Sequence, residues 1–263
     1  MKEVATGNSM DLLQIRQRLD DERRYLACDG RATYTLPRLT RVQMAERGLV
    51  IWSSLDPNEV DEAVLGEIEF HRKANVPFEW KLYCHDRPAD LLDRLKSHGL
   101  EAGEREAVMV YDLAAAEVPQ HMDGVVRRIK TLEQVEDYRL VAEESLGKKY
   151  SFTCNELALA VKNRSTQHLG YVAYDGPEPV SIGRLYTHPL SAFGGLYGGT
   201  TRPAYRRRGF YRTVVAQRAR EAMELGAGYL IVDALPTSRP TLERLGFVHL
   251  TETIPCEWRP SQI

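Results

Sequence analysis

The sequence has few of the features that mark a secreted, membrane or metal-binding protein. It contains only four cysteines, with no C-x-x-C pair and no histidine cluster at the spacing of a zinc site. No apolar run is long enough to cross a bilayer, and the N-terminus lacks the basic-then-apolar pattern of a signal peptide. These absences predict reduced, mostly structural thiols, no bound metal, no membrane partner and a cytoplasmic location.

An excess of charge of either sign is also missing. The formal net charge is -2, with 27% charged and 43% hydrophobic residues, a mixture typical of a globular protein with a sizeable core. A protein that coats nucleic acid would be more basic, so no nucleic-acid partner is expected. The 263 residues are long for one domain and comfortable for two.

Apolar periodicity predicts a first unit over residues 1–118 that alternates helices and strands. Helices are expected over residues 10–26, 56–69 and 90–98, from spacing and end signals such as Pro57 and Gly99. Strands are expected over residues 49–52, 79–83 and 107–113. The Pro- and Thr-rich segment before the first strand is interpreted as turn material.

A second unit is predicted over residues 119–263, after an irregular stretch at 114–124. Its helices are expected over residues 155–162, 209–225 and 240–245, and after a capping box formed by Thr131 and Gln134. Its strands are expected over residues 125–129, 169–174, 180–187, 193–200 and 229–234, with a last one before Trp258. This alternation indicates an α+β (α/β) fold with a mixed sheet.

A weak internal repeat relates the two units. In each, a strand leads to an Arg-Pro pair, then to a short helix that ends at glycine. The pairs are Arg87-Pro88 and Arg239-Pro240, and 239 − 87 gives an offset of 152 residues. A duplicated architecture is the simplest explanation.

One stretch lacks acidic residues entirely. No Asp or Glu occurs between Pro179 and Arg220. The same stretch holds Arg184, Arg202, Arg206, Arg207, Arg208, Arg212, Arg218 and Arg220. Because the first N–H groups of a helix lack partners and the helix dipole is positive there, a pyrophosphate is expected at Arg207–Tyr211. Gly209 would let phosphate oxygens approach the main chain. The alternatives are a solvated helix cap or a basic targeting-like patch, while a nucleotide P-loop is excluded because no Gly-Lys-Ser/Thr follows the glycines.

This segment resembles the cofactor motif of the GNAT superfamily of N-acetyltransferases, Arg/Gln-x-x-Gly-x-Gly/Ala. The motif positions are filled by Arg206, Arg207, Arg208, Gly209, Phe210 and Tyr211, and Pro203 stands three residues ahead. Tyr211 departs from the pattern, which has a small residue there. Residues 242–247 are similar to the family's closing Tyr-Glu-x-Leu-Gly-Phe, and residues 126–129 to its opening strand. The resemblance covers residues 124–258.

The resemblance implies acetyl-CoA as cosubstrate and an amine acceptor, acetylated by direct transfer. It also implies that Gly199 and Thr201 pair with the pantetheine arm through backbone atoms. Ser238 and Arg239 are expected either to touch the far end of the cofactor or to cap the last helix. The first unit has carboxylates where a cofactor turn would stand, over residues 53–62. It is therefore interpreted as a degenerate GNAT-like half, which makes two GNAT-like mixed-sheet units with flanking helices.

Catalytic groups are harder to assign. Asp233, in a buried strand, is the candidate general base, because desolvation can raise its pKa; the alternative is a carboxylate that caps backbone groups. Leu242 stands where related enzymes carry a tyrosine acid, so Tyr197 or Tyr211 is the candidate acid. Four further residues are candidate base or acceptor contacts: His188, Glu143, Glu144 and Tyr150.

A non-catalytic acyl-CoA-binding regulatory protein remains the alternative to an enzyme, favoured by Leu242 and by the uncertain base. The chain is expected to be a monomer or a homodimer.

Overall fold

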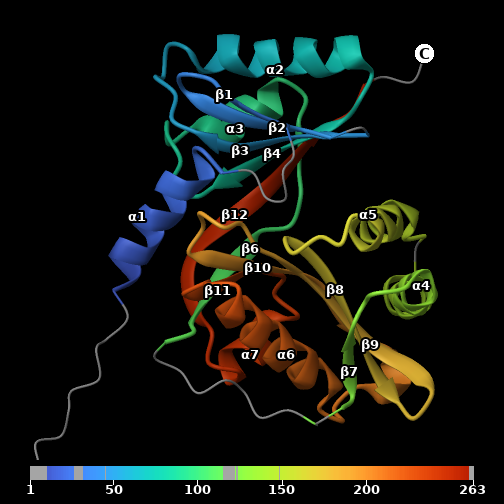
Figure 1. Cartoon of the computed structure of the whole chain (residues 1–263). Helices are drawn as coiled ribbons and strands as arrows, with labels where there is room; N and C mark the ends of the chain where they lie inside the picture. The colour runs from blue at the N-terminus through green and yellow to red at the C-terminus, as the bar shows by residue number, and fades with distance from the viewer. Residues whose placement is uncertain are drawn as a thin grey trace, which may run out of the picture. The chain divides into compact units, whose positions relative to one another are not determined.

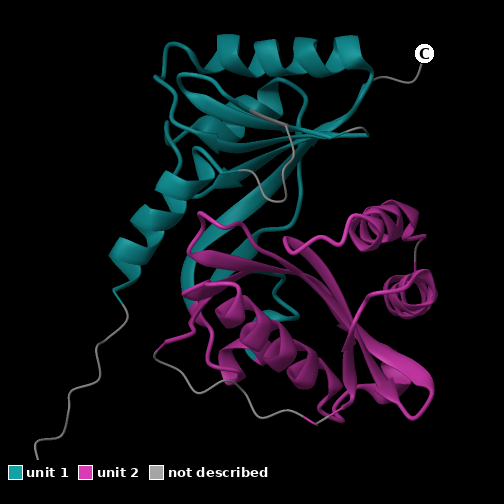
Figure 2. Ribbon diagram, viewed as in Figure 1, with its two compact units in different colours: residues 1–109, 233–240, 249–263 teal, residues 110–232, 241–248 magenta. Residues whose placement is uncertain are grey.

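The computed structural model describes residues 11–26, 32–44, 46–114, 122, 124–147 and 149–260 (Figure 1). The predicted boundary between residues 118 and 119 lies outside them. Two compact units are present, and each collects separate segments of the chain (Figure 2). Unit 1 comprises residues 1–109, 233–240 and 249–263; unit 2 comprises residues 110–232 and 241–248.

Unit 1 is a mixed sheet with helices. Its helices are α1 (Leu12–Arg23), α2 (Val60–Ala74) and α3 (Leu91–Ser97). Its strands are β1 (Ala32–Thr35), β2 (Leu39–Gln43), β3 (Gly48–Ser53), β4 (Phe78–Tyr83), β5 (Glu101–Ala102), the first part of β6 (Glu106–Asp112) and nearly all of β12 (Val248–Trp258). The strand order is β1-β2-β3-β4-β12-β6, and β5 pairs with β12. The last strand of the chain thus pairs with β4 from the first half.

The core of unit 1 depends on that late strand. Trp80 and Phe78 on β4 are almost fully buried, and Ile254 and Cys256 on β12 belong to the same apolar cluster. Cys256 lies opposite Trp80 in the antiparallel register. Burying this apolar surface is the main favourable contribution to folding.

Unit 2 places helices on both faces of its β-strands. Its helices are α4 (Leu132–Leu146), α5 (Ser151–Lys162), α6 (Phe210–Glu224), most of α7 (Arg239–Arg244) and the 3-10 turn η2 (Pro203–Tyr205). Its strands are β7 (Val126–Arg128), β8 (His168–Asp175), β9 (Glu178–Tyr186), β10 (Phe193–Thr201) and most of β11 (Tyr229–Ala234). The strand order is β11-β10-β9-β8-β7, with α4 and α5 on one face and α6 on the other (Figure 1).

The face assignments follow from the alternation of side chains along β9 and β8. A Cβ at Gly183 on β9 would meet the Arg218 guanidinium of α6, whereas one at Gly170 on β8 would meet Leu157 of α5. Gly170 lies opposite Arg184, so Arg184 shares the face that α4 and α5 cover. The capping box of Thr131 and Gln134 opens α4 as predicted.

The repeat appears in the structure as the same succession of elements. The segments β3-α2-β4 and β10-α6-β11 each form a parallel pair of strands joined by a helix, followed by a short helix. In both, the parallel pairing covers only three residues at the start of the first strand: Gly48–Val50 with Phe78–Trp80, and Phe193–Gly195 with Tyr229–Ile231.

Three sequence predictions were wrong in detail. The Pro- and Thr-rich segment contains strands β1 and β2, which pair with each other. Helix α2 begins at Val60, so Pro57 lies in the preceding turn, where the Asp56 carboxylate accepts a hydrogen bond from the Asn58 N–H at 3.0 Å. Helix α5 begins at Ser151, four residues before its predicted start. None of the described helices is long and apolar enough to cross a membrane.

Candidate functional site

Strand β10 has a free edge beside a bulge. Its pairing with β11 stops at Gly195, although β10 continues to Thr201. On its other side the register with β9 shifts between Tyr197 and Thr200, and Gly198 has a φ of 56°. Beyond Gly195, no described strand pairs with the β11 side of β10. Such an edge can pair with an extended amide-containing chain, as predicted for Gly199 and Thr201.

The turn after β10 presents a run of unpaired backbone donors. Arg207 and Gly209 have φ values of 62° and 89°, and Gly209 is the N-cap of α6 without a side-chain cap. Within the described parts of the chain, the N–H groups of residues 207–212 donate no hydrogen bond, and the first one used in α6 is Thr213 N–H to Gly209 O at 3.0 Å. Alternating backbone conformations of this kind form an anion-binding concavity at a positive helix end.

The arginines around this turn are not all available to a ligand. Arg202 forms ion pairs with Glu144 and Glu178, and Arg208 Nη2 lies 2.8 Å from Asp175 Oδ2. Carboxylates from outside the acid-free stretch thus neutralise part of its charge. The turn is less basic than the sequence alone suggests.

Three arginines in and beside the turn have no carboxylate partner among the described residues. Arg206 Nε donates to the Thr201 carbonyl at 3.2 Å. Arg207 and Arg212 are exposed and form no ion pair with any part of the chain that the structure describes. Phe210, by contrast, is buried and anchors the first turn of α6.

Tyr211 packs on the α6 face of the sheet. A Cβ at Gly199 would lie 2.9 Å from Tyr211 Cε2 and 3.3 Å from Arg218 Nη2. Burial lowers the pKa of the Arg218 guanidinium, and the hydrogen-bonded Tyr211 opposes that shift. Arg218 also donates to the Arg184 carbonyl at 3.1 Å. Tyr211, at the motif position where the family has a small residue, therefore packs against β10 from the side that α6 covers.

Tyr197 lies on the opposite face of β10 and is 37% exposed. Its ring meets Tyr186 edge-on, with centroids 4.9 Å apart at 85°. Directly opposite it on β9 is Arg184. Two of the candidate catalytic tyrosines thus lie on different faces of the same strand.

Asp233 and Ser238 belong to unit 1, whereas the cofactor motif belongs to unit 2. The Asp233 carboxylate forms an ion pair and a hydrogen bond with Lys81. Burial first, and then the charge of Asp233, raises the pKa of Glu106 to about 7. The Ser238 hydroxyl donates to the Leu235 carbonyl at 3.0 Å, and Leu242 is buried.

The remaining candidates for acceptor contacts already have partners. The Arg202 hydrogen bond lowers the pKa of Glu144. Glu143 accepts hydrogen bonds from Arg139 and from the Tyr150 N–H, at 2.5 and 3.2 Å. His188 Nδ1 accepts from the Leu190 N–H at 3.1 Å.

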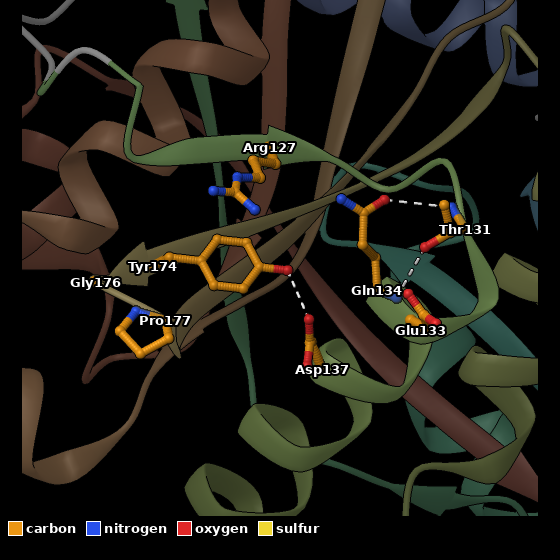
Figure 3. Close-up of a pocket in the computed structure, with 8 residues that line it drawn as sticks. All are labelled: Arg127, Thr131, Glu133, Gln134, Asp137, Tyr174, Gly176 and Pro177. Atoms are coloured by element: carbon orange, nitrogen blue, oxygen red, sulfur yellow. Dashed lines mark hydrogen bonds between the residues drawn. The ribbon is translucent and has the colours of Figure 1, made fainter.

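A pocket beside the start of α4 contains none of the predicted site residues. It has a volume of about 530 Å³ and lies beside the start of α4 and the edge strand β7 (Figure 3). Its walls are bonded to each other: Tyr174 donates to Asp137 at 2.7 Å, and the Arg127 guanidinium lies 4.8 Å from the Tyr174 ring centroid. No group of three or more His, Cys, Asp or Glu among the described residues could hold a metal ion.

Comparison with known proteins supports the fold assignment. No family model and no curated protein sequence matches the chain. Among solved structures, a GCN5-related N-acetyltransferase from Kribbella flavida is similar over 97% of this chain and 98% of its own, with a TM-score of 0.70 and 15% identity. A functionally unknown conserved protein from Staphylococcus epidermidis has a TM-score of 0.66 at 14% identity, covering 88% and 95% of the two chains.

A tandem GNAT protein from the clavulanic acid biosynthesis pathway is also similar, with a TM-score of 0.55 and 10% identity over 85% of this chain and 79% of its own. The chain therefore has the fold of the GCN5-related N-acetyltransferases. The tandem arrangement expected from the sequence has a counterpart among these structures.

Sequence reasoning missed a group of polar residues on the α4 and α5 face of unit 2. Arg184 was counted only as part of the basic stretch, and Tyr138 was not singled out. The available signal was the strand alternation, which places Arg184 on the inward face of β9 although its apolar neighbours suggest a purely structural strand.

Proposed function

We propose that the protein binds acetyl-CoA in unit 2 and transfers its acetyl group to an amine. The observation that carries the proposal is the run of unpaired N–H groups over residues 207–212, next to the free edge of β10. Arg207 and Arg212 would add positive charge to the diphosphate, and Gly209 would leave the approach open. Gly199 and Thr201 would pair with the pantetheine arm.

In this reaction the amine nitrogen attacks the thioester carbonyl, the C–N bond forms, and the C–S bond breaks. The amine loses one proton and the departing thiolate gains one. Backbone N–H groups at the β10 bulge are suitable donors to the oxyanion of the tetrahedral intermediate. Tyr197 or Tyr211 would supply the proton to the thiolate, and the Tyr211 hydroxyl is bonded to Arg218. Asp233 would act as a base only if Lys81 releases it.

A non-catalytic acyl-CoA-binding regulatory protein is the second candidate. The ion pair of Asp233 with Lys81 and the buried Leu242 at the acid position favour it. A monomeric or homodimeric state, a cytoplasmic location and the absence of nucleic-acid or membrane partners stay predictions.

Calorimetry with CoA and a thiol-release assay with acetyl-CoA and a panel of amines test the proposal on the full-length protein. We expect one CoA per chain, and amine-dependent thiol release. Binding that is lost in Gly209→Val but kept in Arg164→Gln, an exposed arginine elsewhere in unit 2, would locate the site. Binding without thiol release for any amine would favour the regulatory protein, and no CoA binding at millimolar concentration would contradict both.

A further inference from the structure

The face of β10 opposite α6 carries a partly enclosed guanidinium with an unused edge. The Arg184 side chain is only 12% exposed. Its Nη1 donates to the Tyr186 hydroxyl at 2.9 Å, and the nearest carboxylate oxygen recorded for it, Glu156 Oε2, is 3.9 Å away. Nε is buried, and no described residue accepts a hydrogen bond from Nε or Nη2. The edge of the guanidinium that binds carboxylates in a two-pronged manner is therefore available.

A second unsatisfied donor converges on the same place. Tyr138 of α4 is fully buried, and its hydroxyl has no hydrogen-bond partner. A Cβ at Gly198 would lie 3.0 Å from this hydroxyl oxygen, 3.4 Å from Arg184 Nε and 3.5 Å from Nη2. The glycine of the bulge thus allows both donors to approach the strand that is proposed to bind the cofactor. Buried donors without acceptors are costly, and they recur where a ligand supplies the acceptor.

The surroundings favour an anion with a single charge. The groups that act most on the charge of Arg184 are the phenols of Tyr138, Tyr150 and Tyr186 and the carboxylate of Glu156, and Glu156 Oε2 lies 3.9 Å from Nη1. Although burial opposes it, the charges and dipoles of these groups raise the pKa of Arg184, so the guanidinium stays protonated. One guanidinium and one phenol match a carboxylate. A phosphate dianion would require further cations, which Arg207 and Arg212 provide on the proposed cofactor turn instead.

We infer that Arg184 and Tyr138 bind a carboxylate of the acceptor, so that the amine to be acetylated belongs to an amino acid or another amine that carries a carboxylate. This inference rests on the proposed function, since it names the acceptor of the same site. Arg184 would hold the carboxylate through Nε and Nη2, and the Tyr138 hydroxyl would donate a further hydrogen bond. The amine would then face the bulge of β10.

Matched amines test this inference on the full-length protein. Each of the twenty amino acids is compared with its carboxamide and, where one exists, its decarboxylated amine, with thiol release from acetyl-CoA as the readout. We expect turnover of carboxylate-bearing amines, with kcat/KM lower on the order of a hundredfold for the carboxamides. In Arg184→Gln the carboxylates should lose the same factor while the carboxamides do not change. Arg184→Lys should recover only part of it, because lysine lacks the planar fork.

Two controls separate this inference from the proposed function. CoA affinity should be the same in wild type, Arg184→Gln and Arg164→Gln, which also shows that the variants fold. If wild type binds CoA but acetylates nothing, the transfer reaction fails. Benzoate binding to the CoA complex then tests the carboxylate site by itself. The site predicts that benzoate binds to the wild-type complex and does not bind to the Arg184→Gln complex.

The inference is overturned if carboxamides and decarboxylated amines react as well as the amino acids, or if Arg184→Gln affects all of them equally. Preferred acetylation of phosphoethanolamine over every amino acid would also overturn it, in favour of a phosphate-bearing acceptor.

Discussion

The turn between β3 and α2 in unit 1 and the turn between β10 and α6 in unit 2 occupy the same place in a repeated motif, yet their backbones differ. In unit 1 the N–H groups of Ser54 and Leu55 donate to the carbonyls of Arg38 and Arg87, and Asn58 and Glu59 donate to Asp56. An isolated parallel bridge between Ser54 and Arg87 joins the segments that follow β3 and β4. The pairing of β10 with β11 ends at Gly195.

The two turns also differ in the charge of their side chains. The first turn of α2 carries Asp61 and Glu62, whereas the first turn of α6 has no acidic residue and follows Arg206–Arg208. Carboxylates near the N-terminus of a helix interact favourably with the positive end of its dipole, so this end needs no bound anion. The turn of unit 1 is thus internally bonded, whereas the N–H groups of residues 207–212 in unit 2 have no acceptor among the described residues.

Charge reversal at the open turn should have the largest effect. Arg207→Glu combined with Arg212→Glu would give α6 an acidic first turn like that of α2. We expect CoA affinity to fall on the order of a thousandfold, about 4 kcal/mol, because two attractive contacts to the diphosphate become repulsive. Calorimetry measures it, with Arg164→Glu as the control. Unchanged affinity would mean that CoA does not bind at this turn.

The two helices that follow these turns, α2 and α6, also differ in the contacts of their buried arginines. Arg41 on β2 forms a buried, two-pronged pair with Glu67 on α2, whereas the buried Arg218 of α6 donates to backbone carbonyls of Val214 and Arg184. We predict that Glu67→Ala lowers the free energy of unfolding by about 3 kcal/mol, since it leaves Arg41 buried and unpaired.

Urea denaturation measures this loss. Glu69→Ala, on the exposed part of the same helix, should shift the midpoint much less. Equal shifts for the two variants would show that the Arg41 pair contributes nothing beyond helix propensity.

A pH dependence should distinguish the carboxylates of unit 1. Because the pKa of Glu106 is about 7 in the folded chain and 4.5 is its ordinary value, the folded state keeps a proton that the unfolded state has lost between these values. The stability that Glu106 contributes is present below pH 4.5 and is lost as the pH rises towards 7. Asp233, Lys81, Glu79 and Glu104 are the charged groups that face it.

Glu106→Gln should therefore gain stability relative to wild type between pH 5 and pH 8, by roughly 1 to 2 kcal/mol once solvent screening of a half-buried group is allowed for. Urea midpoints at the two pH values measure the gain. A difference independent of pH would show that Glu106 is ionised throughout.

The smallest effect is expected at Tyr211. Tyr211→Phe removes the hydrogen bond to Arg218 and should lower the free energy of unfolding by about 1 kcal/mol, with CoA affinity and turnover within twofold of wild type. A loss of turnover with full CoA affinity would instead support the catalytic role predicted for this hydroxyl. Tyr205→Phe, in the preceding turn, is the matched control.

Local patterns predicted the chain of helices and strands well. The capping box at Thr131, the glycine end of α3 at Gly99 and the motif turn at Gly209 each depend on neighbouring residues, and the structure has the expected element at each. Strands β1 and β2 were missed because their polar composition hides a pairing that depends on β3.

The site was harder to foresee, because partners distant in sequence decide which charges remain available. Glu144 and Glu178 pair with Arg202, Asp175 pairs with Arg208, and Lys81 pairs with Asp233. None of these pairs has a local sequence signal. The unused edge of Arg184 likewise depends on Tyr138, from a helix separated from β9 by two other elements.

The place of β12 bears on how such a chain can be divided. Fragments produced by a cut between residues 114 and 124 would separate β4 from the strand that contributes Ile254 and Cys256 to its core. They would also separate Leu113 from the Gly228 carbonyl, to which it donates at 3.0 Å. Each fragment alone would expose the edge of an apolar strand. The two fragments should associate when they are expressed in the same cell. Unit 1 begins at the start of the chain, but it is complete only when residues 249–263 from the other end are present.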